Sequence, residues 1–226
     1  MNPILVAHGT RKTHGVTMIG DLAERVGGVL GVPVRTAFVD VLGPTPADVL
    51  REVPGPAVLV PAFLAGGYHV RTDIPEHVAA SGHPDVIVTD PLGPSAQLVR
   101  VMTDRLVESG WRSSDSVVMA AAGTSDPGAL RDLRVTAAML SAAIGGRVEM
   151  AYAATGEPRV DSAVADLRAR GAQRVVVASY LLADGLFQDR LRASGADVVT
   201  EPLGSHPGVV RLIASRFRRA RLPVAA

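Results

Sequence analysis

The feature that most constrains this chain of 226 residues is an internal repeat. Four short sequences of the first half recur in the second half, in the same order and at offsets of about 111 to 117 residues. The pairs are AHGT (7–10) with AAGT (121–124), AFVDVLGP (37–44) with AYAATGEP (151–158), VLVPAFL (58–64) with VVVASYL (175–181), and TDPLG (89–93) with TEPLG (200–204). Four collinear matches indicate that one structural unit was duplicated.

Each half alternates short valine-rich runs with segments of helical character. The expected strands are residues 4–7, 34–40, 57–64 and 86–89, then 116–122, 148–153, 174–181 and 197–200. The expected helices are residues 16–30, 46–52, 74–80 and 95–108, then 128–144, 160–170, 186–193 and 208–221. This alternation is typical of parallel sheets with right-handed crossovers. We therefore expect an α/β protein with two similar lobes, residues 1–112 and 113–226, each a four-stranded parallel sheet flanked by helices. Exchange of a helix between the lobes remains open.

Composition excludes several classes of function. The formal net charge is +1 and aromatic residues make up only 4%, so neither a basic surface nor stacking residues suggest nucleic-acid binding. The chain has no cysteine, which excludes disulfides, thiolate metal sites and cysteine nucleophiles. No apolar run is long enough to span a bilayer, and the first residues do not resemble a signal peptide. Phosphate-binding and serine-hydrolase motifs are also absent. We expect a cytoplasmic protein without nucleic-acid or membrane partners.

Comparing the two copies of the repeat shows which residues are specific to one of them. Residues needed for backbone geometry should persist in both copies, and Gly9 and Thr10 do match Gly123 and Thr124. Three polar residues of the first half are instead replaced by small or apolar ones: His8 by Ala122, Asp40 by Ala154, and His69 by Leu186 or Gly185, depending on the loop gap. A special function of the first half would explain this asymmetry.

These three polar residues lie at or just beyond the expected carboxyl ends of strands. Ligands of open α/β sheets bind beyond the carboxyl ends of the strands, so His8, Asp40 and His69 are able to converge on one site. Two imidazoles and a carboxylate suit a divalent iron, cobalt or nickel ion, and they also serve as proton acceptors. The alternative reading of a histidine at a strand end is a satisfied core or capping residue.

The segment from His8 to Lys12 precedes an expected helix and resembles an anion-binding turn. Its backbone N–H groups, together with Thr10, Arg11 and Lys12, would hold carboxylates there. The alternative is an ordinary strand-to-helix turn with exposed charges.

Three segments resemble the sirohydrochlorin chelatases, the SirB/CbiX group of class II chelatases. They are LVAHGTR near the start of the chain, FVDVLGPTP after the second strand, and PAFLAGGYHVRTDIP after the third. The resemblance covers the whole chain, because long members of the family are fused repeats. The third segment is the most specific, since it carries the pattern G-x-H-x-x-x-D-I-P behind an apolar strand.

The resemblance implies a chelatase-like fold and the insertion of Fe2+ or Co2+ into sirohydrochlorin, for siroheme or cobalamin, without ATP or an organic cofactor. It implies that His8 and His69 face the metal and the tetrapyrrole. An acidic residue of the family, often glutamate, corresponds to the shorter Asp40. Because the substrate carries eight carboxylates, Thr10, Arg11, Lys12 and Arg71 are expected to bind it.

Several alternatives remain open from the sequence. A two-lobed protein that binds or delivers a metal or tetrapyrrole without turnover is the main alternative function. Imidazole and carboxylate ligands accept iron, cobalt and nickel alike, so the ligand types do not select the metal. A chain that contains both copies of the repeat is expected to work as a monomer.

Overall fold

The computed structural model describes residues 1–9 and 13–220. The strands of the first sheet are β1 (Asn2–Ala7), β2 (Arg35–Phe38), β3 (Ala57–Pro61) and β4 (Val86–Val88). Those of the second are β5 (Ser116–Gly123), β6 (Val148–Thr155), β7 (Val175–Tyr180) and β8 (Val198–Val199). The helices are α1 (Thr13–Leu30), α2 (Pro46–Glu52), the π-helix η1 (His69–Asp73), α3 (Ile74–Ser81), α4 (Ala96–Glu108), α5 (Pro127–Ile144), α6 (Val160–Ala169), α7 (Leu186–Arg192) and α8 (Pro207–Ala220).

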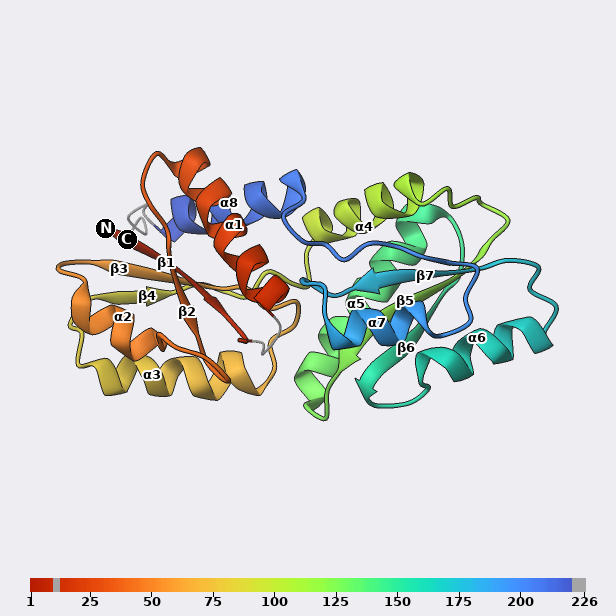
Figure 1. Cartoon of the computed structure of the whole chain (residues 1–226), viewed down its shortest axis with the longest axis horizontal. Coiled ribbons are helices and arrows are strands. Elements are labelled where there is room, and N and C mark those ends of the chain that lie inside the picture. Colours follow the sequence, from red (N-terminus) through yellow and green to blue (C-terminus); the bar gives the residue numbers. More distant parts are fainter. Residues whose placement is uncertain (10–12, 221–226) are drawn as a thin grey trace. The chain divides into compact units, whose positions relative to one another are not determined.

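The two sheets have the same topology, as the repeat predicts. The strand order is β2-β1-β3-β4 in the first sheet and β6-β5-β7-β8 in the second, and every pairing is parallel. The expected α/β class with two four-stranded parallel sheets is confirmed (Figure 1).

The compact units of the structure differ from the expected lobes in their last helices. The first unit covers Met1–Leu92 and resumes at Pro207 with α8, and the second covers Gly93–His206. The expected boundary near residue 112 therefore describes the sequence repeat and not the compact units. The reason is packing: α8 contacts α1 and β3 of the first unit, whereas α4 contacts α5 and β7 of the second. The helix exchange that the sequence left open is present.

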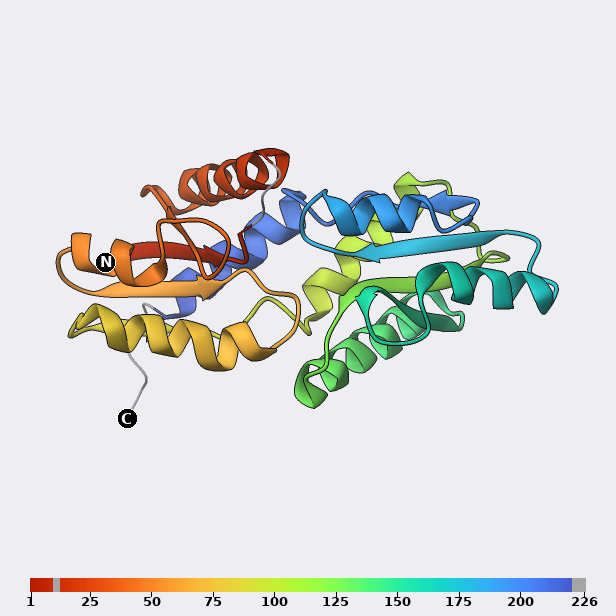
Figure 2. The ribbon, with the colours of Figure 1, turned by 60° about the horizontal axis from the view of Figure 1, so that its bottom comes forward.

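Helices cover both faces of the first sheet. Helices α1 and α8 pack together on one face, and α2 and α3 pack together on the other (Figures 1 and 2). Strands β1 and β3 are buried because they lie in the middle of the sheet under both helical layers. The side facing α2 and α3 holds a core of apolar side chains: Ile4, Val6, Ala37, Val49, Leu50, Val53, Ala57, Leu59 and Ile74.

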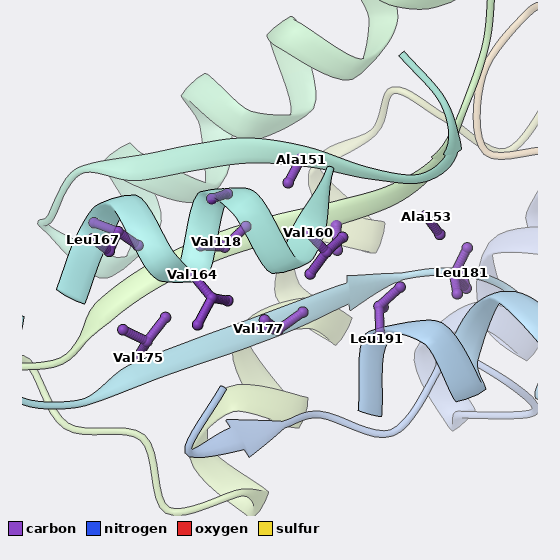
Figure 3. Packing of buried hydrophobic residues seen from close by; sticks show 12 residues of the cluster. Val118, Ala151, Ala153, Val160, Val164, Leu167, Val175, Val177, Leu181 and Leu191 are labelled. Carbon is purple, nitrogen blue, oxygen red and sulfur yellow. The ribbon is translucent and has the colours of Figure 1, made fainter. Parts of the chain in front are cut away.

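The second unit has a corresponding core between its sheet and helices α6 and α7. Valines of β5 and β7 meet the apolar side of α6, and Leu191 of α7 completes the cluster (Figure 3). This core contains no ionisable side chain. The second copy is therefore built on the same packing scheme as the first.

Backbone hydrogen bonds repeat between the two units. The N–H of Phe38 donates to Pro44 O (2.9 Å), and that of Tyr152 donates to Pro158 O (3.0 Å), an offset of 114 residues in both cases. The N–H of Thr89 donates to Leu59 O (3.0 Å), as Thr200 does to Val177 O (2.9 Å). The last pair corrects the letter alignment of 58–64 with 175–181 by one residue. A run of valines carries little register information, so the letters alone allow this slip.

Local signals set some boundaries and tertiary contacts set others. Helix α2 has the expected bounds because Thr45 and Asp48 form a capping box and Pro46 opens the first turn. Strand β2 instead ends at Phe38, two residues before Asp40, because the loop turns back and Pro44 O accepts the Phe38 N–H.

Among the described residues, none of the helices is long and apolar enough to cross a membrane.

Candidate functional site

His8 and His69 lie side by side in the first unit. His8 directly follows β1, and His69 opens η1 after the loop that leaves β3. Because β1 and β3 are neighbours in the sheet, their carboxyl ends meet at the same edge. The two ring centroids are 4.6 Å apart and the ring planes cross at 83°. The structure therefore brings together the two imidazoles that the sequence singled out.

Each imidazole uses its Nδ1 atom for a local hydrogen bond. Nδ1 of His8 lies 3.0 Å from Gly9 O, and Nδ1 of His69 lies 2.5 Å from Oδ2 of Asp73. A carbonyl oxygen and an ionised carboxylate can only accept, so Nδ1 is the protonated nitrogen of both rings. In the neutral state the lone pair of each ring is then on Nε2, the form that binds metals and accepts protons.

Asp73 is a site residue that the sequence reasoning did not select. It lies at the last position of η1, four residues after His69, and its side chain is largely buried (19% exposed). The spacing in the pattern H-x-x-x-D was the available signal, since residues four apart share one side of a helix. The wide turn is closed by the N–H of Ile74, which donates to His69 O. Short π-helical segments are frequently found at functional sites.

Asp40 lines the same groove as His69, and its side chain is bonded within its own loop. Its side chain is exposed in the loop after β2, and its Oδ1 atom accepts the N–H of Val41 at 2.7 Å. Of the residues that the structure describes, no three His, Asp or Glu side chains form a group able to hold a metal ion. The two imidazoles come together, whereas the carboxylate is bonded to its own loop.

A groove of about 530 Å³ adjoins His69 on the side of Asp73. Its lining contains three carboxylates, and His8 is not part of it. The lining residues are Val39, Asp40, Tyr68, His69, Asp73, Glu76, His77 and Ala80. Three negative groups beside an imidazole favour a cation over an anion at this position.

The rings of Phe63 and Tyr68 lie close to His69. Phe63 lies 5.9 Å away between centroids, and Tyr68 lies 6.0 Å away in an edge-on arrangement. Tyr68 is 59% exposed, so an aromatic surface is open to solvent directly beside the imidazole pair.

The residues expected to bind substrate carboxylates are only partly described. Thr10, Arg11 and Lys12 lie outside the described residues. Arg71 is exposed on η1, two residues after His69. Its charge is thus present on the segment that carries the imidazole.

The glycine that follows His8 has a packing role that recurs in the second unit. A Cβ atom on Gly9 would lie 2.1 Å from Asp40 O, and one on Gly123 would lie 1.8 Å from Thr155 O. Both copies therefore require glycine, because the backbone at the end of the second strand (Thr155) or just after it (Asp40) passes close to this position. Ala122, the counterpart of His8, is partly buried in an apolar core. The imidazole is the feature present in the first copy alone.

This two-lobed α/β protein with paired imidazoles at one sheet edge has clear relatives. The family model described as CbiX matches residues 2–109 and again residues 116–220. The chain therefore belongs to the CbiX family, and the double match confirms the internal duplication.

Individual relatives agree with this assignment. A sirohydrochlorin cobaltochelatase of Methanothermobacter thermautotrophicus is 25% identical over 126 residues, which cover 46% of this chain and 88% of that protein. SirB from Bacillus subtilis, solved with Fe3+, superposes with a TM-score of 0.82 at 22% identity, covering 97% of this chain and 95% of that one. CbiX, described as the terminal enzyme for siroheme biosynthesis in denitrifying bacteria, superposes with a TM-score of 0.74 at 21% identity, covering 99% and 100%. The expected chelatase-like fold is confirmed over the whole length.

Proposed function

We propose that this protein is a sirohydrochlorin chelatase, which inserts a divalent metal ion into the tetrapyrrole without ATP or an organic cofactor. The observation that carries the proposal is the pair formed by His8 and His69, with centroids 4.6 Å apart and Nδ1 of each ring already bonded. Membership of the CbiX family and the similarity to a sirohydrochlorin cobaltochelatase support the choice of substrate.

The chemistry requires two operations. The metal ion must lose part of its water shell, and the two pyrrole N–H groups must lose their protons as the metal–nitrogen bonds form. The Nε2 lone pairs of His8 and His69 are suited to both, because neutral imidazole binds iron, cobalt and nickel and also accepts protons. The products are the metallated tetrapyrrole and two protons.

Asp73 and the carboxylates of the groove support these operations. Asp73 holds His69 in the tautomer whose lone pair is on Nε2, as carboxylates do behind metal-binding histidines. Asp40, Asp73 and Glu76 line the groove beside His69 and raise the local concentration of a divalent cation. Arg71, with Thr10, Arg11 and Lys12, is proposed to bind carboxylates of the substrate.

An insertion assay tests the proposal. Sirohydrochlorin is mixed with Fe2+, Co2+ or Ni2+ and protein at one hundredth of the substrate concentration, and the absorbance spectrum is followed with time. Conversion of many substrate molecules per protein molecule is expected with iron or cobalt. Spectral change that stops at one substrate per protein would instead support a carrier that binds metal or tetrapyrrole without turnover.

We further propose that the protein acts as a monomer in the cytoplasm. The absence of cysteine suits a reducing compartment, and one chain carries both copies of the repeat. Light scattering coupled to size-exclusion chromatography tests the first point, with a mass near 23.5 kDa expected.

A further inference from the structure

The start of η1 settles how the two copies of the repeat correspond around His69. Helix η1 begins at His69 and has Tyr68 as its N-cap, whereas α7 begins at Leu186 and has Gly185 as its N-cap. Aligning the two helix starts pairs His69 with Leu186, which decides between the two alternatives that the sequence allowed. The same alignment pairs Tyr68 with Gly185. The first copy therefore carries an aromatic ring, as well as an imidazole, that the second copy lacks.

The side chain of Tyr68 forms neither a helix cap nor part of a core. The N-cap position favours Ser, Thr, Asp, Asn or Gly, and Tyr68 makes no capping hydrogen bond through its side chain. The side chain is 59% exposed, whereas aromatic side chains stabilise a fold chiefly by being buried. Gly185 shows that a helix starts at the equivalent position of the second unit without an aromatic residue. Folding therefore does not account for the ring.

The ring of Tyr68 lies directly beside the imidazole pair. Its centroid is 6.0 Å from that of His69, and the two ring planes cross at 76°. The His69 ring is in turn 4.6 Å from the ring of His8. Tyr68 and His69 also line the same groove of about 530 Å³. An exposed flat apolar surface thus adjoins the groups that are proposed to receive the metal ion.

We propose that Tyr68 is a substrate-binding residue whose ring packs against the tetrapyrrole and orients it beside the imidazoles. A tetrapyrrole is a flat conjugated ring system, and flat aromatic groups attract one another in offset-stacked or edge-to-face arrangements. Such a contact holds the pyrrole nitrogens in place while the metal–nitrogen bonds form, which lowers the entropic cost of reaching the transition state. The contact uses the ring of Tyr68 and not its hydroxyl group. This inference rests on the chelatase function proposed above.

Three variants of Tyr68 separate the contribution of the flat ring from other effects. Tyr68→Phe keeps the ring and removes the hydroxyl group. Tyr68→Leu keeps an apolar side chain without a flat face, and Tyr68→Ala removes nearly all of the side chain. Val107→Ala is the control, because Val107 is an apolar side chain of α4 that is 64% exposed in the second unit.

Binding is measured without metal, by titrating sirohydrochlorin with the full chain and following the absorbance and fluorescence of the tetrapyrrole. Tyr68→Ala is expected to raise the Kd roughly tenfold, the order of effect found for one aromatic ring stacked on a nucleic-acid base. Tyr68→Leu should also bind more weakly than wild type, whereas Tyr68→Phe and Val107→Ala should stay within about threefold of it. The unfolding midpoint of Tyr68→Ala should be unchanged, because the ring is mostly exposed.

Steady-state insertion kinetics provide the second measurement. In Tyr68→Ala the KM for sirohydrochlorin should rise, while the KM for Co2+ should stay as in wild type because both imidazoles are intact. A Kd for sirohydrochlorin that is the same in Tyr68→Ala and wild type would overturn the inference. So would an equal loss of affinity in Tyr68→Phe and Tyr68→Ala, because the hydroxyl group would then be the group that binds.

Failure of the proposed function gives a different result. Wild-type protein that binds metal-free sirohydrochlorin but inserts no metal would count against the chelatase activity. Weaker binding by Tyr68→Ala than by Tyr68→Phe in that same experiment would still support the role of the ring.

Discussion

Asp73 lies four residues after His69, and its Oδ2 atom is 2.5 Å from Nδ1 of the imidazole. The carboxylate accepts the Nδ1–H bond, which leaves the Nε2 lone pair available and holds the ring in one orientation. This pair is contained within η1, so the π-helical segment carries both the imidazole and the group that orients it.

We expect Asp73→Ala to lower kcat for metal insertion by roughly 10- to 100-fold, the usual effect of removing a group that orients a metal-binding histidine. Asp73→Asn should have an intermediate effect, because its oxygen still accepts the Nδ1–H but carries no charge. Steady-state insertion rates measure both. Glu108→Ala, which removes an exposed ion pair with Arg105 in the second unit, is the matched control. Normal turnover by Asp73→Ala would mean that His69 needs no such support.

His8→Ala and His69→Ala should each reduce insertion by at least about 100-fold, because each removes one of the two Nε2 groups that we propose for desolvation of the metal and for proton removal. The folded state should persist in both, which circular dichroism and the unfolding midpoint would report. His83→Gln serves as the control, since His83 is bonded to Val53 O in another part of the unit. If both alanine variants turned over normally, the imidazole pair would not be the catalytic site.

Two glycine-to-alanine substitutions should change the free energy of unfolding in opposite directions, because Gly123 lies against another backbone segment and Gly20 does not. Gly123 has a φ of 97°, and a Cβ there would lie 1.8 Å from Thr155 O, so Gly123→Ala should destabilise the protein by more than about 1 kcal/mol. Gly20 lies in α1 with nothing within 4 Å of an added Cβ. Gly20→Ala should therefore stabilise the helix by about 0.5–1 kcal/mol. Chemical denaturation gives both free energies of unfolding, and changes of equal sign would contradict the packing argument.

Acid should destabilise the second unit in part through Asp197. The backbone N–H of Val175 (2.7 Å) and then the guanidinium of Arg168 (3.0 Å) hold the pKa of this carboxyl below its ordinary value. The ionised form is favoured in the folded state, so its contribution is present above the unfolded-state pKa of about 3.9 and is lost as the pH falls through the folded-state pKa.

The test of this pH dependence is the free energy of unfolding measured between pH 6 and pH 3. Asp197→Asn should show a smaller loss of stability over this range than wild type, because the group that titrates is gone. Asp21→Asn makes the same change in net charge on α1 and is the control. Equal acid sensitivity of wild type and Asp197→Asn would assign the effect to other carboxyl groups.

The sequence by itself determined the duplication and the order of the strands and α-helices, although not the π-helix η1, and it singled out the two imidazoles that the structure brings together. These depend on local information: apolar periodicity, helix caps such as Thr45, and letters that persist or disappear between the copies. Helix α2 has the predicted bounds for this reason, since its start is fixed by side chains within its first turn.

Tertiary structure decided which helices pack with which sheet. Helices α4 and α8 follow equivalent strands and both carry an apolar side, so the sequence pattern does not distinguish their destinations. The contacts of α8 with α1 and β3 exist only once the sheet is assembled.

Tertiary structure also decided the chemistry of the site. His8 and His69 meet because β1 pairs with β3, a choice of strand order that no local pattern encodes. The hydrogen bond between Asp73 and His69 depends on side-chain geometry within a π-helix, where one rotation about a bond redirects an oxygen atom. Helix caps and apolar periodicity depend on residues close together in the sequence, so the sequence alone reveals them. The distances between strand ends depend on how the whole sheet packs.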